Sequence, residues 1–268
     1  MEPYLHGYDT EEQHRLHSQN DVLSPLIYRN IDLSNRSQIL EIGCGSGAQM
    51  LHVLKTYPDA HITGVDHSML QLESCLNYLK ASKIGLERFQ LIHADGTHLP
   101  IPDQAFDTIL FVWVLEHISN PIPILFEAFR TLQEKGVMYF TEVYNRSFQH
   151  CPEKPEISNF WNRMMVFQQN LSGNGNIGIQ LANLLSSLPV SELETWAVPV
   201  FYDRSQPDAK NQMFNYWTEL MRSAALQMIK NNCLSLAEWQ KVAYAMDELI
   251  NDPDSVFFYN WIQAKVIR

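Results

Sequence analysis

The chain has 268 residues, 46% of them hydrophobic and 18% charged, which provides enough apolar material for a sizeable core and excludes a disordered or low-complexity protein. Asp and Glu (30) outnumber Lys and Arg (19), giving a formal charge of -11 with no basic run. We therefore expect no nucleic-acid partner, because phosphate-backbone binders need basic stripes. The longest apolar run, Ile109–Leu115, is far shorter than the roughly 20 residues that span a bilayer, and the polar N-terminus has no signal segment. The sequence predicts a cytoplasmic protein with no membrane partner.

The four cysteines are widely spaced and form no CxxC or CxxH pair. They are Cys44, Cys75, Cys151 and Cys233. This spacing predicts reduced, mostly buried thiols rather than a zinc site or a disulfide framework.

Residues 38–145 alternate short apolar runs with helical patterns, which is typical of βαβ units on a parallel sheet. Five strands are predicted, at Gln38–Ile42, His61–Val65, Phe89–His93, Asp107–Val114 and Val137–Val143. Helices are predicted between them at Ala48–Tyr57, at Ser68–Ser82 with Ser68 as N-cap, and at Ile122–Glu134. The fourth strand is apolar without alternation, so we expect helices on both of its faces.

The pattern changes after Tyr144 to longer helical segments. We predict helices at Ile157–Asn170, Ile179–Leu188, Asp208–Lys230 and Leu236–Ile250, and strands at Glu192–Tyr202 and Val256–Val266. Apolar residues recur at helical spacing from Met213 to Met228, which indicates a core stripe or a dimer face. Because no repeat or long linker is visible, we predict one domain, 1–268, with an N-terminal leader (1–35), a cofactor-binding core (38–143) and helical insertions (145–175 and 203–252).

The most informative segment runs from a strand into Gly43, Gly45 and Gly47 and then into a helix. Glycines in such a turn let the backbone bend tightly and approach a ligand. The next two strands end at Asp66 and Asp95, where a carboxylate can bind a ribose diol or read an adenine edge. The sequence therefore predicts a nucleoside-containing cofactor at the carboxyl edge of the sheet.

Two cofactor classes fit this edge, a dinucleotide and S-adenosylmethionine. The dinucleotide fingerprint G-x-G-x-x-G places its third glycine at position 48, which is Ala48 here, whereas this chain has G-x-G-x-G. Alanine is tolerated at that position, so the spacing alone is only suggestive. Glu41 favours S-adenosylmethionine, because an acidic group on the strand can anchor the loop and compensate an ammonium.

Four segments together carry a clear family resemblance. They are LEIGCGSGAQ, GVDHS, ADGTHLPIPDQAFDTILFVWVLEHISNP and VMYFTEV, in this order within residues 38–143. The chain resembles the class I S-adenosylmethionine-dependent methyltransferases, in particular the ubiquinone/menaquinone-biosynthesis type and the small-molecule methyltransferases. The resemblance implies an α/β fold: a Rossmann-like seven-stranded, mostly parallel sheet with helices on both faces, an antiparallel last strand, and inserted helices that form a substrate lid.

The resemblance also implies a cofactor, S-adenosyl-L-methionine, with S-adenosyl-L-homocysteine as product and no metal. It places Glu41 and the glycine loop at the methionine portion, Asp66 at the ribose, Met69 on the adenine face and Asp95 at the adenine amino group. The full cofactor-binding set that we predict is Glu41, Gly43, Cys44, Gly45, Gly47, Asp66, His67, Met69, Asp95, Gly96, Val112, Trp113, Arg15 and Tyr4. One segment departs from the family: Glu134-Lys135-Gly136 replaces a Pro-Gly-Gly turn.

The N-terminal leader is similar to one that folds over the cofactor in some of these enzymes. There Arg15 would clamp the methionine carboxylate, and Tyr4 or Tyr8 would hydrogen-bond it or close the substrate pocket. The alternative is a solvated amphipathic helix whose arginine faces water.

Methyl transfer from a sulfonium is an in-line displacement, so alignment in a dry pocket can supply much of the catalysis. Trp113 is placed to hold the sulfonium electrostatically. His117, just past the fourth strand, is the candidate general base, with a structural role as the alternative. Aromatic residues after the fifth strand suit an apolar or ring-bearing acceptor, or they simply pack the inserted helices; they include Tyr144, Phe160, Trp161 and Phe167.

These observations leave three hypotheses. The first is an S-adenosylmethionine-dependent methyltransferase whose partner is a small-molecule acceptor, apolar or aromatic. The second is a methyltransferase of protein or peptide side chains, and the third is a non-catalytic cofactor-binding subunit. The sequence leaves open whether the chain forms a homodimer.

Overall fold

The computed structural model describes residues 5, 15 and 22–268. Its centre is an eight-stranded sheet in the order β3-β2-β1-β4-β5-β8-β6, with β7 paired to β8. The strands are β1 (Gln38–Ile42), β2 (His61–Asp66), β3 (Phe89–His93), β4 (Phe106–Val112), β5 (Leu132–Val143), β6 (Gln149–Cys151), β7 (Glu192–Tyr202) and β8 (Val256–Ile267).

The sheet is parallel from β3 to β5, and β8 runs antiparallel to β5, β6 and β7. The predicted mostly parallel α/β sheet with an antiparallel last strand is therefore confirmed. An eighth strand, β6, was not predicted, because its three residues are too short for a periodic pattern.

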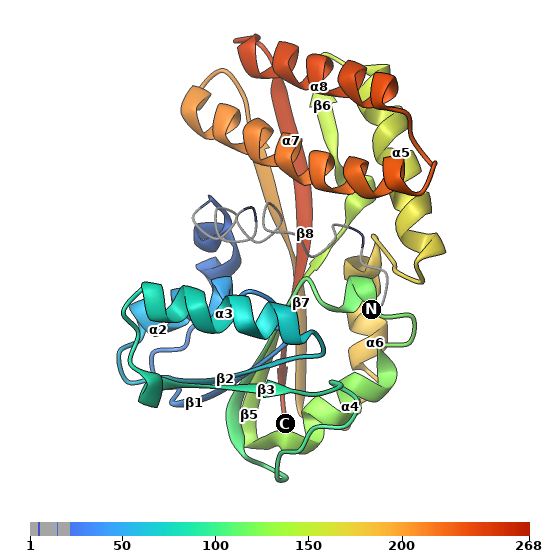
Figure 1. The fold of residues 1–268 in the computed structure, drawn as a ribbon. Coiled ribbons are helices and arrows are strands. Elements are labelled where there is room, and N and C mark those ends of the chain that lie inside the picture. The colour runs from blue at the N-terminus through green and yellow to red at the C-terminus, as the bar shows by residue number, and fades with distance from the viewer. Residues whose placement is uncertain (1–4, 6–14, 16–21) are drawn as a thin grey trace.

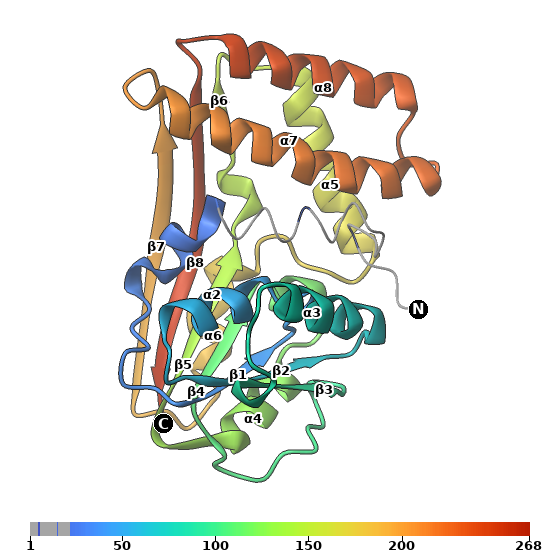
Figure 2. The same cartoon turned by 60° about the vertical axis from the view of Figure 1, so that its left-hand side comes forward.

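Helices cover both faces of the sheet (Figures 1 and 2). The helices α2 (Ala48–Thr56) and α3 (Met69–Ala81) lie on one face, and α4 (Ile122–Thr131) and the short α6 (Leu181–Leu185) lie on the other. Ser68 caps α3 as predicted, its hydroxyl accepting from the Gln71 N–H at 3.4 Å. Strand β4 is buried along its middle, Thr108–Phe111, as expected for a strand covered on both sides.

Three long helices form a cap at one end of the molecule (Figures 1 and 2). They are α5 (Pro155–Asn170), α7 (Pro207–Lys230) and α8 (Leu236–Asn251), and they pack on one another. The long strands β7 and β8 extend past the end of β5 and run up into this cap. The two strands β7 and β8 thus connect the predicted helical insertions to the core.

Two predicted helix boundaries were wrong. The helix expected to reach Glu134 ends at Thr131, because Leu132 already pairs with Phe106 on β4. The following residues, up to Gly136, bulge out before the regular pairing of Val137 with Thr108, and Lys135 has a φ of 61° there. The helix expected at Ile179–Leu188 is instead a 3₁₀ turn, Ile177–Gln180, followed by α6.

The expectation of mostly buried cysteines holds for only half of them. Cys44 and Cys75 are buried, whereas Cys151 and Cys233 are exposed, and all four are free thiols. Exposure follows from their places, since Cys151 is in the edge strand β6 and Cys233 is in the turn between α7 and α8.

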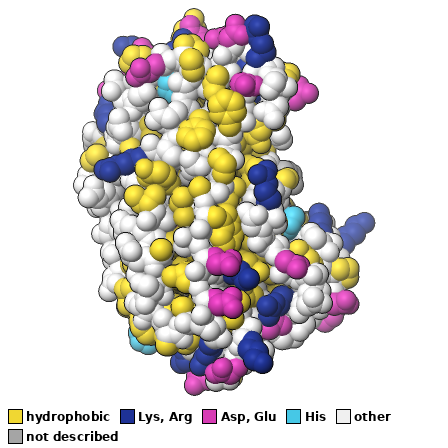
Figure 3. Space-filling model, turned by 180° about the vertical axis from the view of Figure 1, so that it is seen from behind, with side chains coloured by type: hydrophobic (Ala, Val, Ile, Leu, Met, Phe, Trp, Pro, Cys, Tyr) yellow, Lys and Arg dark blue, Asp and Glu magenta, His cyan; other side chains and the backbone are white. Residues whose placement is uncertain are grey.

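The surface seen in Figure 3 mixes basic and acidic side chains without a continuous basic strip on that face. Within the described residues, no helix combines the length and the apolar character that crossing a membrane requires.

Candidate functional site

A cavity of about 700 Å³ opens at the carboxyl edge of the parallel strands. One half of its wall comes from the glycine loop and the ends of β2, β3 and β4. The other half comes from the cap, through α5, α7 and β8. Its volume lies in the range of about 300–1,000 Å³ that is usual for small-molecule sites.

The glycine loop is held in a left-handed backbone conformation that few other residues adopt. Gly43, Gly45 and Gly47 have φ values of 72°, 51° and 82°. A Cβ at Gly45 would meet nothing within 4 Å, so this part of the loop faces open space, and Gly45 lines the cavity. A Cβ at Gly47 would lie 2.4 Å from the Cys75 sulfur, so that glycine lets α2 and α3 pack closely.

Asp66, at the end of β2, ties this loop to the sheet. Its Oδ2 accepts from the Gly45 N–H at 2.9 Å, and its Oδ1 accepts from the Ser68 N–H at 2.8 Å. A carboxylate offers about four lone-pair sites, so two acceptor positions remain for a ligand hydroxyl pair. Asp66 is 8% exposed and lines the cavity, as a ribose-binding carboxylate should.

Asp95 lies further along the same edge, on the loop after β3. Its Oδ1 accepts from the Thr97 N–H at 2.9 Å and from the Thr97 hydroxyl at 2.8 Å. These hydrogen bonds hold the pKa of the Asp95 carboxyl below its usual range, so it is ionised at neutral pH. An exposed, ionised acceptor in the cavity wall suits an amino group of a ligand.

Glu41 is the buried acid of β1, 2% exposed and also part of the cavity wall. Burial, with a further contribution from Asp66, raises the pKa of Glu41 well above its usual value. Its Oε2 has no hydrogen-bond partner among the described residues. A buried acceptor of this kind is costly unless a ligand or water completes it.

The segment after β4 carries the next group of wall residues. Trp113 has a φ of 55°, which is uncommon for a bulky residue, and its N–H donates to the Thr141 carbonyl at 2.9 Å. Glu142 at the end of β5 accepts from the Val114 N–H at 3.0 Å and from the Leu115 N–H at 2.8 Å. Glu142 thus fixes the turn that presents Trp113 and the residues after it to the cavity.

Glu116 and Glu142 form a pair of buried acids behind this turn. Burial raises the pKa of Glu116 to about 7, against the hydrogen bond from the Gln168 amide (2.7 Å) and the charge of Arg15, which lower it. Burial, then the charge of Glu116, raises the pKa of Glu142 to about 8. At neutral pH the two carboxyls therefore hold about one proton between them.

His117 follows at once, with its Nε2 3.7 Å from Oε1 of Glu116. Burial in the cavity wall, then the neighbouring His67, lowers the pKa of His117 to about 4, against the charge of Asp66. The imidazole is therefore neutral at pH 7 and able to accept a proton, but it would hold that proton weakly. Its role as general base stays a prediction.

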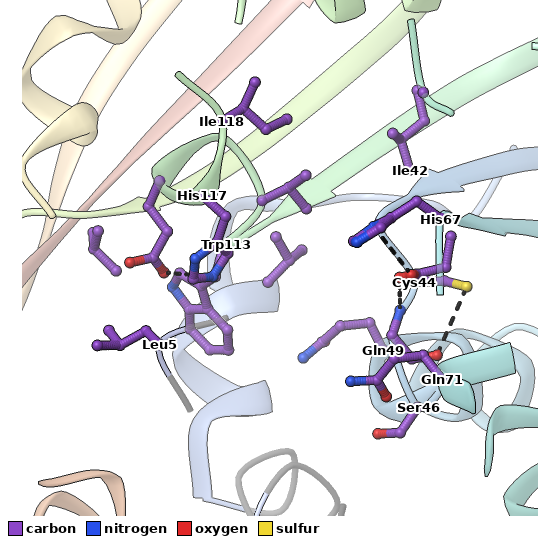
Figure 4. A pocket seen from close by; sticks show the side chains of 18 of the residues that line it. Leu5, Ile42, Cys44, Ser46, Gln49, His67, Gln71, Trp113, His117 and Ile118 are labelled. Atoms are coloured by element: carbon purple, nitrogen blue, oxygen red, sulfur yellow. Dashed lines mark hydrogen bonds and ion pairs between the residues drawn. The ribbon is translucent and has the colours of Figure 1, made fainter. Parts of the chain in front are cut away.

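Figure 4 shows two sides of the cavity near the strand ends. Trp113, His117 and Leu5 lie on one side, and Cys44, Gln49 and Gln71 lie on the other. The described wall residues thus surround a space that reaches from the glycine loop to the turn after β4.

The cap half of the cavity is built from aromatic rings. Trp161 of α5, Trp217 of α7 and Trp261 of β8 all line it. Neighbouring ring centroids are 5.7 Å apart between Trp161 and Trp217 and 6.1 Å apart between Trp113 and Trp261. Tyr259 of β8 lies between them, 4.7 Å from Trp217 and 5.0 Å from Trp261. This wall is a continuous set of π faces.

Most of the predicted cofactor set lines this one cavity. Those residues are Arg15, Glu41, Gly43, Cys44, Gly45, Asp66, His67, Asp95, Gly96, Val112 and Trp113, and the candidate base His117 lines it too. Gly47 and Met69 are not in the wall, and Met69 is 50% exposed at the start of α3. Tyr4 and Tyr8 lie outside the described residues.

Several wall residues had no predicted role. Gln49 and Gln71 are polar residues on the cavity-facing sides of α2 and α3, and Tyr216 and Trp217 come from α7. The predicted apolar stripe of α7 was interpreted as core or dimer face. Its members Trp217 and Leu220 also line the cavity, whereas the buried core residues among its members are Met213, Phe214, Met221, Ala224 and Met228. Glu142 was missed as well, although an acid inside the apolar run of β5 is a signal that could have found it.

Comparison with known families identifies the kind of domain that forms this edge of the sheet. Residues 40–140 match the methyltransferase domain family. They contain a class I S-adenosylmethionine-dependent methyltransferase domain. The recognition made from the four sequence segments is thereby confirmed.

Curated relatives of this methyltransferase domain match over part of their length. A probable (S)-tetrahydroprotoberberine N-methyltransferase 2 of Papaver bracteatum is 26% identical over 143 residues, which is 53% of this chain and 39% of the relative. A demethylmenaquinone methyltransferase of Chlamydia trachomatis is 31% identical over 111 residues, 41% of this chain and 46% of the relative. The chain thus spans less than half the length of these two proteins.

A solved structure matches over nearly the whole chain. It is a phosphoethanolamine N-methyltransferase 2 of Haemonchus contortus in complex with phosphomonomethylethanolamine and S-adenosylhomocysteine. Its TM-score is 0.59 at 12% identity, and the alignment covers 96% of this chain and 57% of that one. At this identity the likeness concerns the fold, and it extends the methyltransferase fold to the cap helices.

Proposed function

We propose that this protein transfers a methyl group from S-adenosylmethionine to a small-molecule acceptor with apolar or aromatic parts. One observation carries the proposal: a single cavity joins the glycine loop and its acidic partners to an aromatic chamber under the cap. A cofactor half and an acceptor half in one enclosure are what direct group transfer requires.

The residues of the first half suit the cofactor. Glu41 has a buried oxygen without a partner among the described residues, Gly45 faces open space, and Asp66 keeps two acceptor positions. Glu41 would lie at the methionine portion, Asp66 at the ribose and Asp95 at the adenine amino group. Arg15, 9% exposed in the wall, is the residue proposed for the methionine carboxylate.

When bound, S-adenosylmethionine supplies an electrophilic methyl group on a positively charged sulfur. The chain's own contribution is to align the acceptor, exclude water and stabilise positive charge with the Trp113 ring. Among the described residues no three His, Cys, Asp or Glu side chains are grouped as a metal ion would require. Transfer without a metal stays a prediction.

The shape of the cavity supports a small acceptor over a polypeptide side chain. Asn145, Trp161 and Met164 line it from the first helical insertion, and Tyr216, Trp217 and Leu220 line it from the second. Both insertions therefore cover the acceptor half, as a lid over a small molecule would. The curated relatives that methylate an alkaloid or a menaquinone precursor, by their names, agree with this proposal.

Two measurements test the function. Isothermal titration with S-adenosylmethionine and S-adenosylhomocysteine should show binding of both to the full chain. Incubation of metabolite extracts with cofactor carrying a trideuterated methyl group should then yield, by mass spectrometry, a small molecule that has gained that methyl group.

The outcomes separate the hypotheses. Absence of binding of either compound would contradict both methyltransferase proposals. Binding without a labelled small molecule, but with labelled protein in the extract, would instead support the polypeptide acceptor. Binding with no labelled product of any kind would leave the non-catalytic subunit.

A further inference from the structure

The cavity wall is lined by more acidic than basic side chains. Four carboxylate residues line it, Glu41, Asp66, Asp95 and Glu116, whereas Arg15 is the one Lys or Arg among its described lining residues. S-adenosylmethionine brings one net positive charge. Three of the acids belong to the cofactor half, which leaves Glu116 as the acid of the acceptor half.

Glu116 lies against the cap. It is 8% exposed, and its Oε2 accepts from the side-chain amide of Gln168 at 2.7 Å, on the helix α5 that also supplies Trp161 to the cavity wall. The polar ends of the nearby aromatics are already satisfied: the Tyr259 hydroxyl donates to Oδ1 of Asn145 at 2.8 Å, and Nε1 of Trp161 donates to the Asn145 carbonyl at 2.7 Å. The polar groups of Tyr259 and Trp161 are therefore both hydrogen-bonded to Asn145, and the rings present their apolar faces.

Two indole N–H groups of this wall, those of Trp113 and Trp217, are buried without a hydrogen-bond partner among the described residues. An N–H of this kind is costly unless water or an acceptor atom of a ligand completes it, which marks the chamber as a binding site. An ammonium offers no acceptor atom, so these two groups do not themselves select a cation.

A carboxylate beside several aromatic faces is the chemical environment that binds an organic cation. Aromatic faces attract ammonium groups through their quadrupole, and more strongly where water is excluded. The same faces accept the hydrocarbon parts of the molecule. An anionic or strongly acidic acceptor would instead meet the charge of Glu116.

We propose that the acceptor is an organic amine, held as its ammonium form by Glu116 and by the aromatic faces of Trp161, Trp217, Tyr259 and Trp261. This inference rests on the proposed function and names the substrate class of the same site. Glu116 and Trp217 are then its specificity residues.

The transfer step balances with Glu116 as proton acceptor. A primary or secondary ammonium gives its N–H proton to the Glu116 carboxylate; the freed nitrogen lone pair forms the N–CH₃ bond, the CH₃–S bond breaks and its electron pair stays on sulfur. A tertiary ammonium likewise gives its single N–H proton to the Glu116 carboxylate before its lone pair forms the N–CH₃ bond, and it leaves as a quaternary ammonium. The pKa of Glu116, about 7, is suited to such an exchange near neutral pH.

Other charged groups face Glu116 and bear on this exchange. Arg15 lowers the pKa of Glu116, the Gln168 amide donates to its Oε2, and His117 lies 3.7 Å from its Oε1 but is neutral at pH 7. Glu142 is the second buried acid, and its carboxyl shares the negative charge with that of Glu116. At neutral pH this group of two acids with about one shared proton and one arginine is close to neutral, and a bound ammonium favours loss of that proton and the ionised form of Glu116.

The test compares two probes of the same shape. These are 4-(trimethylammonio)phenol, which is a cation, and 4-tert-butylphenol, which is neutral. Binding to the full chain saturated with S-adenosylhomocysteine is followed by tryptophan fluorescence or calorimetry. We expect the cation to bind at least about tenfold more tightly, and Glu116→Gln to reduce that preference to about threefold or less.

Three readouts distinguish failure of the amine proposal from failure of the proposed function. S-adenosylhomocysteine binding should be unchanged in Glu116→Gln, and Glu219→Gln, on the exposed side of α7 where Glu219 pairs with Arg222 at 2.8 Å, should keep the full cation preference. With S-adenosylmethionine present, the protein should form S-adenosylhomocysteine faster with N-methylphenethylamine than with 4-ethylphenol.

Equal affinity for the two probes, or an undiminished preference in Glu116→Gln, overturns the amine proposal while cofactor binding leaves the methyltransferase proposal intact. If Glu116→Gln does not fold, Trp217→Leu provides the comparison. Loss of that ring face should weaken the cation at least about threefold more than the neutral probe, and equal weakening of both contradicts the proposal.

Discussion

Asp66 has two roles, and two measurements on one variant can distinguish them. Its oxygens position the glycine loop and the start of α3, and its remaining acceptor sites face the cavity. We expect Asp66→Ala to weaken S-adenosylhomocysteine binding at least tenfold, about 1.4 kcal/mol, through loss of the ribose hydrogen bonds. Calorimetry measures the affinity, and thermal unfolding measures the structural role.

The controls for this prediction are two further variants. Asp66→Asn keeps one carbonyl acceptor and should lose less affinity than Asp66→Ala. Asp59→Ala removes an exposed carboxylate in the turn before β2 and should bind as the native protein does. Native affinity in Asp66→Ala would mean that other residues hold the ribose.

The core residues predicted from the sequence share one property: each lies at or near a strand end within a local pattern. Glu41, Gly45, Asp66 and Asp95 could be placed because parallel strands bring their carboxyl ends to one edge. Tyr259 could not, because its contact with Asn145 joins residues more than a hundred positions apart through the pairing of β8. Local pattern does not encode such contacts.

At the scale of elements, most bounds were predicted within two residues. Strand β4 ends at Val112 rather than Val114, but β5 begins at Leu132 rather than Val137. The bounds of β7 match the prediction fully, since its residues 192–202 are bordered by turn residues on both sides. The end of α4 was wrong because the helical pattern continues past Thr131 into residues that β4 recruits as a strand. Tertiary pairing there overrode the local preference.

The cap depends on α8, whose N-terminus is closed by a capping box. The Ser235 hydroxyl accepts from the Glu238 N–H at 3.2 Å, and the Glu238 carboxylate accepts from the Ser235 N–H at 2.7 Å. We expect Ser235→Ala to lower the free energy of unfolding by about 1 kcal/mol, because one helix N–H loses its acceptor. Urea denaturation measures this loss.

A serine in the body of α5 supplies the comparison. Ser158→Ala removes no cap, so its free energy of unfolding should equal or slightly exceed that of the native protein. If Ser235→Ala is as stable as Ser158→Ala, the capping box does not contribute to the stability of the cap.

At the scale of the whole molecule, the site exists because core and cap are joined. The core brings the acids and glycines to one edge, and β8 carries Tyr259 and Trp261 from the sheet to the chamber under α7. The sequence predicted both parts and an enclosing lid, but not that the aromatic residues of α7 and β8 would form a single wall. That arrangement depends on the crossing of elements that are distant along the chain.

The joined structure also buries a pair of acids, which links its stability to pH. Glu142 is fully buried and its folded-state pKa is about 8, against an ordinary value near 4.5. Between these values the folded chain holds a proton that the unfolded chain has lost. The stabilisation linked to this proton is therefore complete below about pH 4.5 and is lost as pH rises through about 8.

The free energy of unfolding of the ligand-free protein should therefore fall between pH 5 and 8 more steeply in the native chain than in Glu142→Gln. One fully linked proton corresponds to up to about 1.4 kcal/mol per pH unit. Urea denaturation at each pH measures the two slopes. The histidines with lowered pKa, such as His52, act in the opposite direction but are common to both proteins, so they cancel in the difference. Glu248→Gln, which removes the exposed partner of Lys154, should keep the native slope, whereas a native slope in Glu142→Gln would show that Glu142 is ionised throughout this range.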